Sequence, residues 1–167
     1  NYDKDQPGSS ITISGDANIS TDGTGVHAGA RSIITIGGGG TIRTEKHKNI
    51  SHFALNAEEG IINMNAKLNQ AGEMIGAGNR TTKVYGNIGI IDREESANIS
   101  GSRPTVINLG LTTSDSVLHG VVLDDFKEHN KNEPDKKDIR ERTGLSMYLQ
   151  NGASWHNEVW GTMVPSE

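Results

Sequence analysis

The chain contains no cysteine, few aromatic residues and no long apolar run. Without cysteine it forms neither a disulfide nor a thiolate metal site, and this absence leaves its compartment open. No apolar stretch reaches the roughly 18 residues that a membrane-spanning helix requires. Because 32% of the 167 residues are hydrophobic and 4% aromatic, the core cannot be built like that of an ordinary globular domain.

The charge balance excludes a further group of partners. The formal net charge is −5 and the sequence pI is near 5.7, so there is no basic surface for nucleic acid or for an anionic membrane. The first residues, NYDKDQPGSS, do not resemble a signal peptide and look like the interior of a longer protein. We therefore expect one segment over residues 1–167, a fragment whose targeting or anchoring parts lie outside it.

Glycine and asparagine are abundant. The chain has 21 Gly and 15 Asn, the residues that enter left-handed backbone conformations most easily. The apolar residues are mainly Ile, Leu and Val in short alternations, which argues against disorder. The sequence therefore predicts a chain of short strands that turns often.

These alternations form a repeat. Each unit begins with apolar residues at its first and third positions, and another follows five or six residues later. Successive units are separated by 23, 28, 22, 23 and 38 residues. The six units start at Ile11, Ile34, Ile62, Val84, Ile107 and Leu145.

A repeat of this length with short strands predicts an all-β fold, a right-handed parallel β-helix of about six coils. Stacking at about 4.8 Å places like residues on like, so a few inward Ile and Leu make a continuous core. Left-handed hexapeptide helices, the coiled heads of trimeric adhesins and leucine-rich repeats have other periods. A β-sandwich remains an alternative, although it does not require the same motif at the same phase in every unit.

The run ITIGGGGTIRT, residues 34–44, raises the question of a phosphate-binding loop. A loop of the GxxxxGK[ST] type needs a lysine at its end and a helix after it, whereas Thr41 and Ile42 begin another strand here. We therefore interpret residues 37–40 as a corner between two strands.

The repeat is interrupted at 127–143, KEHNKNEPDKKDIRERT, where six Lys and Arg mix with five Asp and Glu. This composition predicts an inserted charged loop at a corner, and such loops on rigid scaffolds often carry recognition. A smaller excursion spans 45–60. The candidate partner-binding residues are the loop cations and a tryptophan expected to be exposed: Lys136, Lys137, Arg140, Arg142 and Trp160.

No motif predicts a metal, a cofactor or a catalytic residue. The six histidines lack HxH or HxxxH spacing, and the GGxGxD calcium nonapeptide is absent. The catalytic alternative is a β-helix enzyme that cuts polysaccharides, which needs carboxylates converging on one face. Asp92 with Asp115 or Asp124, together with Arg93, are the candidates for such a cluster.

The closing unit carries a resemblance. GLSMYLQNGASWHNEVWG, residues 144–161, resembles a segment common in passenger domains of bacterial autotransporters, where LxLxLxNGAxW leads into a further strand. Leu145, Met147 and Leu149 then alternate inward, Asn151-Gly152 makes the corner, and Trp155 begins the next strand. The preceding TVINLGLTTSDSVLHGVVLDD is similar to the Thr-Ser-rich coil before that segment.

The resemblance implies a pectin-lyase-like right-handed β-helix at the bacterial cell surface or secreted, commonly adhesive, with a membrane barrel encoded further on. We expect a non-catalytic, monomeric stalk or adhesive surface without cofactor, whose partner is a host-surface protein or glycan. The alternatives are a polysaccharide lyase or glycoside hydrolase of the same fold, and a fibre of the phage tail-spike kind, which would be trimeric.

Overall fold

The computed structural model describes residues 8–29, 31–47, 52–92, 105–126 and 143–161. Over these ranges the chain is all-β, with sixteen strands and no helix. Accordingly, no helix in the described ranges is long and apolar enough to cross a membrane. Fourteen of the strands form three parallel sheets, and two form a small antiparallel pair.

Each sheet collects every third strand of the regular repeat. Sheet A contains β1 (Ser10–Ile13), β4 (Ile33–Ile36), β7 (Ile61–Met64), β12 (Val106–Leu111) and β15 (Gly144–Leu149). Sheet B contains β2 (Ala17–Thr21), β5 (Gly40–Thr44), β10 (Thr82–Tyr85), β13 (Val117–His119) and β16 (Ser154–His156). Sheet C contains β3 (Val26–Gly29), β6 (Leu55–Glu58), β11 (Ile88–Asp92) and β14 (Val122–Phe126).

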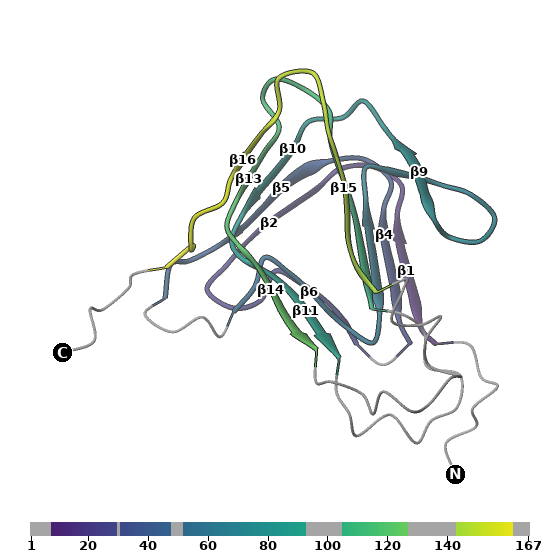
Figure 1. Ribbon diagram of the computed structural model, residues 1–167, viewed down its shortest axis with the longest axis horizontal. Helices are drawn as coiled ribbons and strands as arrows, with labels where there is room; N and C mark the ends of the chain where they lie inside the picture. Colours follow the sequence, from purple (N-terminus) through teal and green to yellow (C-terminus); the bar gives the residue numbers. More distant parts are fainter. Residues whose placement is uncertain (1–7, 30, 48–51, 93–104, 127–142, 162–167) are drawn as a thin grey trace, which may run out of the picture.

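The three sheets form the three sides of a triangle (Figure 1). The chain visits sheets A, B and C in that order and then returns to A beside its earlier strand, so every pairing within them is parallel. An all-β fold of parallel strands in stacked sheets is thus confirmed. Its physical basis is that each sheet can bury its inner face against the other two.

The described residues make five strands in sheet A, which corrects the expectation of six coils. Val84 does not begin a new unit, because it lies in sheet B and pairs with Ile42. The turn that starts at Ile62 returns to sheet A at Ile107, so it is about twice as long as expected. Alternation indicates a strand but not which sheet the strand joins.

An antiparallel hairpin accounts for part of that long turn. Strands β8 (Ala66–Leu68) and β9 (Met74–Ala77) pair between β7 and β10. The hairpin projects from the corner between sheets A and B (Figure 1). Leu68 is therefore a hairpin residue, and Ile75 in the facing strand β9 is 61% exposed.

The core consists of columns of like residues. In sheet A, the register aligns Ile11, Ile34, Ile62, Ile107 and Leu145, and next to them Ile13, Ile36, Met64, Leu109 and Met147. Sheet B contributes Ile19, Ile42, Val84, Leu118 and Trp155, and sheet C contributes Val26, Leu55, Ile88 and Val122. In the second to fourth turns nearly all of these side chains are fully buried, with Ile34 and Val122 partly buried, so few apolar residues suffice for a continuous core.

The corners are held by backbone hydrogen bonds between turns. All four N–H groups of Gly37–Gly40 donate within the chain, to Ile13 O, Gly15 O, Asp16 Oδ1 and Thr81 O. The run joins β4 to β5, which confirms the predicted corner and leaves none of its N–H groups for a phosphate.

The closing unit follows its expected geometry in part. Leu145 and Met147 pack against the core as predicted, whereas Leu149, also expected to point inward, is 44% exposed. Asn151 and Gly152 have φ angles of 56° and 81°, the left-handed values of a tight turn. Trp155 lies in β16, as predicted. The charged loop at 127–143 lies outside the described residues except for Thr143.

Candidate functional site

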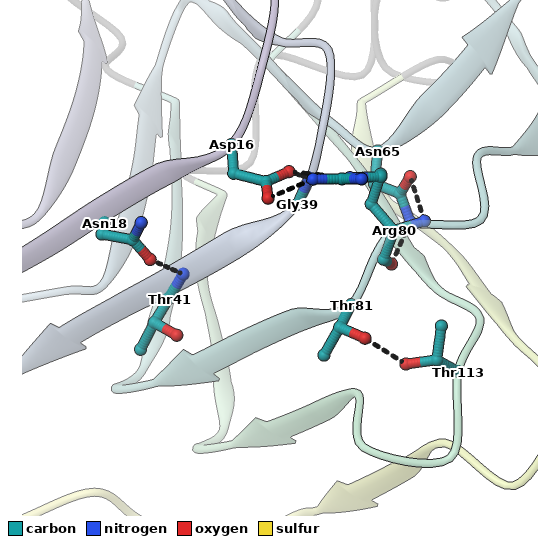
Figure 2. A network of polar contacts seen from close by, with 8 residues as sticks. All are labelled: Asp16, Asn18, Gly39, Thr41, Asn65, Arg80, Thr81 and Thr113. Atoms are coloured by element: carbon teal, nitrogen blue, oxygen red, sulfur yellow. Dashed lines mark hydrogen bonds and ion pairs between the residues drawn. The ribbon is translucent and has the colours of Figure 1, made fainter.

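Two groups of polar side chains link successive turns. The first occupies the corner between sheets A and B, and the second lies on the outer face of sheet B. We define the corner network by Asp16, Asn65, Arg80, Thr81 and Thr113, and it is drawn in Figure 2.

Asp16 and Arg80 connect the first and third turns. Arg80 donates from Nε and Nη2 to the two Asp16 oxygens at 3.1 and 2.7 Å, a bidentate arrangement (Figure 2). The Gly39 N–H of the second turn donates to the same carboxylate at 2.9 Å. The Arg80 side chain, followed by this N–H, lowers the pKa of Asp16 below its ordinary value, and Asp16 in turn raises the pKa of Arg80.

Asn65 is the buried centre of the corner network. Its side chain is fully buried, and its backbone has a φ of 50°. The Nδ2 group donates to Arg80 O at 3.0 Å and to Gly110 O at 3.1 Å. Asparagine suits this position because it tolerates the left-handed conformation and satisfies backbone groups that the corner leaves unpaired. Asn65 therefore fastens the base of the hairpin to the fourth turn.

Hydroxyl groups continue the corner network. Thr81 and Thr113 share a hydrogen bond of 2.8 Å (Figure 2), and Ser116 Oγ accepts the Thr82 N–H at 3.0 Å. On the adjoining outer face, Asn18 Oδ1 accepts the Thr41 N–H. The polar atoms of the corner network thus form hydrogen bonds that join successive turns, which is a structural role.

The second group follows from the alternation of sheet B. Since Ile42, Val84 and Leu118 point inward, the next residue in each strand points outward. The register stacks these residues one above another on successive turns. The resulting outer row of sheet B consists of Ser20, Arg43, Tyr85, His119 and His156.

Ring and cation contacts run along the outer row. The Arg43 guanidinium carbon lies 3.9 Å from the centroid of the Tyr85 ring. The rings of His119 and His156 are stacked with centroids 5.3 Å apart. A cation over an aromatic face is attracted by the ring quadrupole, so the outer row is held in an ordered arrangement.

Trp160 packs across the outer row. Its ring centroid is 5.8 Å from that of Tyr85 and 5.0 Å from that of His119. Lys46 Nζ lies 4.5 Å from the Trp160 ring centroid, and Arg43 lies 5.8 Å from it. We call Arg43, Lys46, Tyr85, His119, His156 and Trp160 the aromatic–cation patch.

Hydrogen bonds fix Trp160 in this position. Its backbone N–H donates to Asn87 Oδ1 at 3.0 Å, and Asn87 Nδ2 donates to Trp160 O at 3.1 Å. The indole N–H donates to Thr44 O at 2.9 Å. Because Asn87 is buried and also accepts the Val121 N–H, the tryptophan is anchored to the corner of the third and fourth turns.

Trp160 is the one predicted partner-binding residue that the structure describes. It was expected to be exposed, but it is half-buried, because a half-buried indole gains both packing and a partner for its N–H. Lys136, Lys137, Arg140 and Arg142 lie outside the described residues.

The acidic residues of the enzyme alternative are distributed over different elements. Asp92 and Asp124 lie in neighbouring strands of sheet C, but the register pairs Asp92 with Phe126 and Asp124 with Ile90. Asp115 lies in the turn between β12 and β13, at a different corner, and Arg93 is outside the described residues. Among the described residues no group of three or more His, Asp or Glu side chains is arranged to hold a metal ion.

The sequence reasoning missed the outer row. Arg43, Tyr85, His119 and His156 are far apart in the chain and share no local motif. The signal was present nonetheless, because each directly follows an inward residue of its unit: Ile42, Val84, Leu118 and Trp155. Alignment of the strands by those inward residues would have placed the four side chains together.

Comparisons with known proteins complete the description of the site. No protein-family model matches the chain, and neither a curated protein nor a solved structure shows a significant match.

Proposed function

We propose that the chain is a non-catalytic segment of a bacterial autotransporter passenger, folded as a right-handed parallel β-helix, that serves as a rigid stalk and adhesive surface. Its place is the bacterial cell surface or the extracellular medium, its partner is a host-surface protein or glycan, and it works as a monomer without a cofactor. A membrane barrel outside this segment would anchor it.

The fold supports a stalk. Its three parallel sheets place strand on strand at about 4.8 Å, and each added turn lengthens the body along one direction. The corner network and the core columns join neighbouring turns on several sides. A body held in this way resists bending and presents its outer faces over a long distance.

The observation that carries adhesion is the aromatic–cation patch on the outer face of sheet B. A stalk alone requires outward residues that are polar, whereas this patch gathers the rings of Tyr85 and Trp160 with the cations Arg43 and Lys46. Tyrosine, tryptophan and arginine are the side chains that contribute most to binding energy at interfaces. The aromatic–cation patch therefore supports recognition through the side of the stalk.

The polysaccharide-active enzyme is the second candidate, and Asp92 and Asp124 on neighbouring strands are the observation in its favour. Turnover of polygalacturonate or a related uronate polymer by the purified chain would support it. Loss of that turnover in Asp124→Asn would assign the reaction to this chain and overturn the non-catalytic proposal.

Adhesion is tested with the purified chain labelled with a fluorophore. We expect saturable binding to epithelial cells or to surfaces coated with host matrix, and a monomer by light scattering. A chain that binds no host surface overturns the adhesive part of the proposal, and a trimer favours the fibre. Sequencing the gene beyond Glu167 tests the secretion route, since a passenger is followed by a frame of alternating, barrel-forming strands.

A further inference from the structure

We propose that the aromatic–cation patch binds an acidic polysaccharide, a chain of sugars that bears carboxylate or sulfate groups. This inference rests on the proposed function and names the ligand class of its adhesive face. The first observation concerns the exposure and the ion pairing of two cations, Arg43 and Lys46.

Both cations are exposed, and neither has an acidic partner in the part of the chain that the structure describes. Among the described residues, neither Arg43 nor Lys46 forms an ion pair, and Glu158 beside the patch approaches His119 instead, at 3.7 Å. The chain as a whole has an excess of acidic residues, with 21 Asp and Glu against 16 Lys and Arg. Two unpaired cations on one face of an acidic protein are a place where an external anion can bind.

The aromatic rings fix the positions of these two cations before a ligand binds. Arg43 lies over Tyr85 at 3.9 Å, and Lys46 lies over Trp160 at 4.5 Å. A guanidinium that lies over a ring face keeps its N–H edge free for a carboxylate or sulfate. Because Asn87 and Thr44 hold Trp160 in place, less side-chain entropy is lost when the ligand binds.

The sheet also restricts how a ligand can bind. Strand β5 is paired on both sides, with β2 and β10, and β10 is paired with β5 and β13. No backbone edge is therefore available at the centre of the patch, so a peptide cannot add a strand there. Recognition at the centre of the patch therefore has to use side chains. A sugar chain that bears anionic groups fits this surface, because its carboxylates or sulfates can reach the two cations without any backbone pairing.

The test measures binding of the purified chain to four immobilised polymers: heparin, polygalacturonate, dextran and poly-glutamate. Heparin carries sulfate groups and polygalacturonate carboxylates, so the pair distinguishes the two anions. Dextran is uncharged, and poly-glutamate is an acidic peptide. We expect binding to at least one acidic polysaccharide with an affinity at least about tenfold above that for dextran and poly-glutamate.

The variants locate the site. The double variant Arg43→Gln with Lys46→Gln removes both cations, and we expect about tenfold weaker binding or more. Lys67→Gln is the control for a single charge, because it removes one cation from an exposed position of the hairpin strand β8, away from the patch, and should change the affinity by less than about twofold. Arg43→Lys keeps the charge but loses the planar fork, so we expect an intermediate loss.

Several outcomes would overturn the inference. If dextran binds as tightly as the acidic polysaccharides, the patch does not recognise charge. If poly-glutamate binds as tightly as they do, the patch does not recognise the sugar. An equal loss in the double variant and in Lys67→Gln places the ligand elsewhere. If the double variant fails to fold, the binding of the natural chain to the four polymers still tests whether the ligand is an acidic polysaccharide. A chain that adheres to host cells but to neither acidic polysaccharide refutes this inference and leaves the proposed function standing.

Discussion

The column of isoleucines in sheet A allows a direct test of the stacked fold. Ile62 lies in the middle turn, is fully buried, and is aligned with Ile34 on one side and Ile107 on the other. Ile11 occupies the same position in the first turn but is 57% exposed. The substitution to alanine removes the same atoms at both positions, so the difference in cost reports the stacking alone.

The structure sets the expected magnitudes. Ile62→Ala removes buried atoms and leaves a cavity between two neighbours, which costs about 2–5 kcal/mol of unfolding free energy. Ile11→Ala removes a side chain with less than half of its surface buried, and solvent fills the space, so the cost is about 1 kcal/mol. Ile75→Ala serves as a control in the hairpin, where the side chain is 61% exposed and we expect little change.

Urea unfolding followed by circular dichroism measures the three variants beside the natural chain. The shift in midpoint gives the cost if the slope of the transition is unchanged. Equal destabilisation by Ile62→Ala and Ile11→Ala would refute the column, because Ile11 in the first turn is stacked on one side only, whereas Ile62 is covered by a neighbour on both sides. A cost below about 1 kcal/mol for Ile62→Ala would refute its place in the core.

Three further predictions concern the corners. Asn65→Gly keeps the left-handed backbone but loses the side-chain hydrogen bonds, which costs about 2 kcal/mol of unfolding free energy. Asn65→Ala should cost about 1 kcal/mol more, because alanine is strained at a φ of 50°. Equal costs for the two variants would mean that the backbone conformation is unimportant. The pKa of Asp16 is lowered in the folded state, so the ionised carboxylate stabilises the fold above about pH 4, and this stabilisation is lost as the pH falls through the lowered pKa. The stability difference between Asp16→Asn and the natural chain should therefore vanish in acid. A difference that does not depend on pH would contradict the ion pair. Gly40→Ala places a Cβ against Ala17 O at a φ of 108° and should lower stability by at least about 2 kcal/mol, whereas Gly15→Ala meets no atom within 4 Å and should be nearly neutral. Thermal melts measure both variants, and equal melting temperatures would contradict this corner geometry.

Much of the fold was predictable because the evidence for it is local. Residues that alternate with period two, such as Ile34 and Ile36, indicate a strand and its inward face without reference to the rest of the chain. The corner at Gly37–Gly40 was likewise predictable, because glycine marks the conformations that a turn requires. Together with the repeat of the unit along the chain, these local rules led to the correct class of structure, all-β with parallel strands in stacked sheets.

The number of turns was not predictable from the same pattern. The unit at Val84 has the alternation of its neighbours, yet it belongs to sheet B of a turn already begun at Ile62. The hairpin of β8 and β9 lengthens that turn, and its residues include an apolar pair, Met74 and Ile75, that reads like any other strand. Corner length decides which side of the triangle a strand joins, and alternation carries no information about it.

The candidate site was even less predictable from the sequence than the number of turns. Trp160 was selected from the sequence, but as an exposed residue and without its partners. Arg43 and Tyr85, which lie beside it in space, precede it by 117 and 75 residues in the sequence. No local rule connects them, because their proximity depends on the register of sheet B and on the path of the chain after β16.

The sequence by itself therefore determined the strands, their inward faces and several corners, since each depends on residues within a few positions of one another. Tertiary structure alone decided which strands stack, how many turns they make and which outward side chains meet. The physical reason is the parallel stacking itself. It brings together residues one turn apart, and the length of a turn varies with every corner and insertion along the chain.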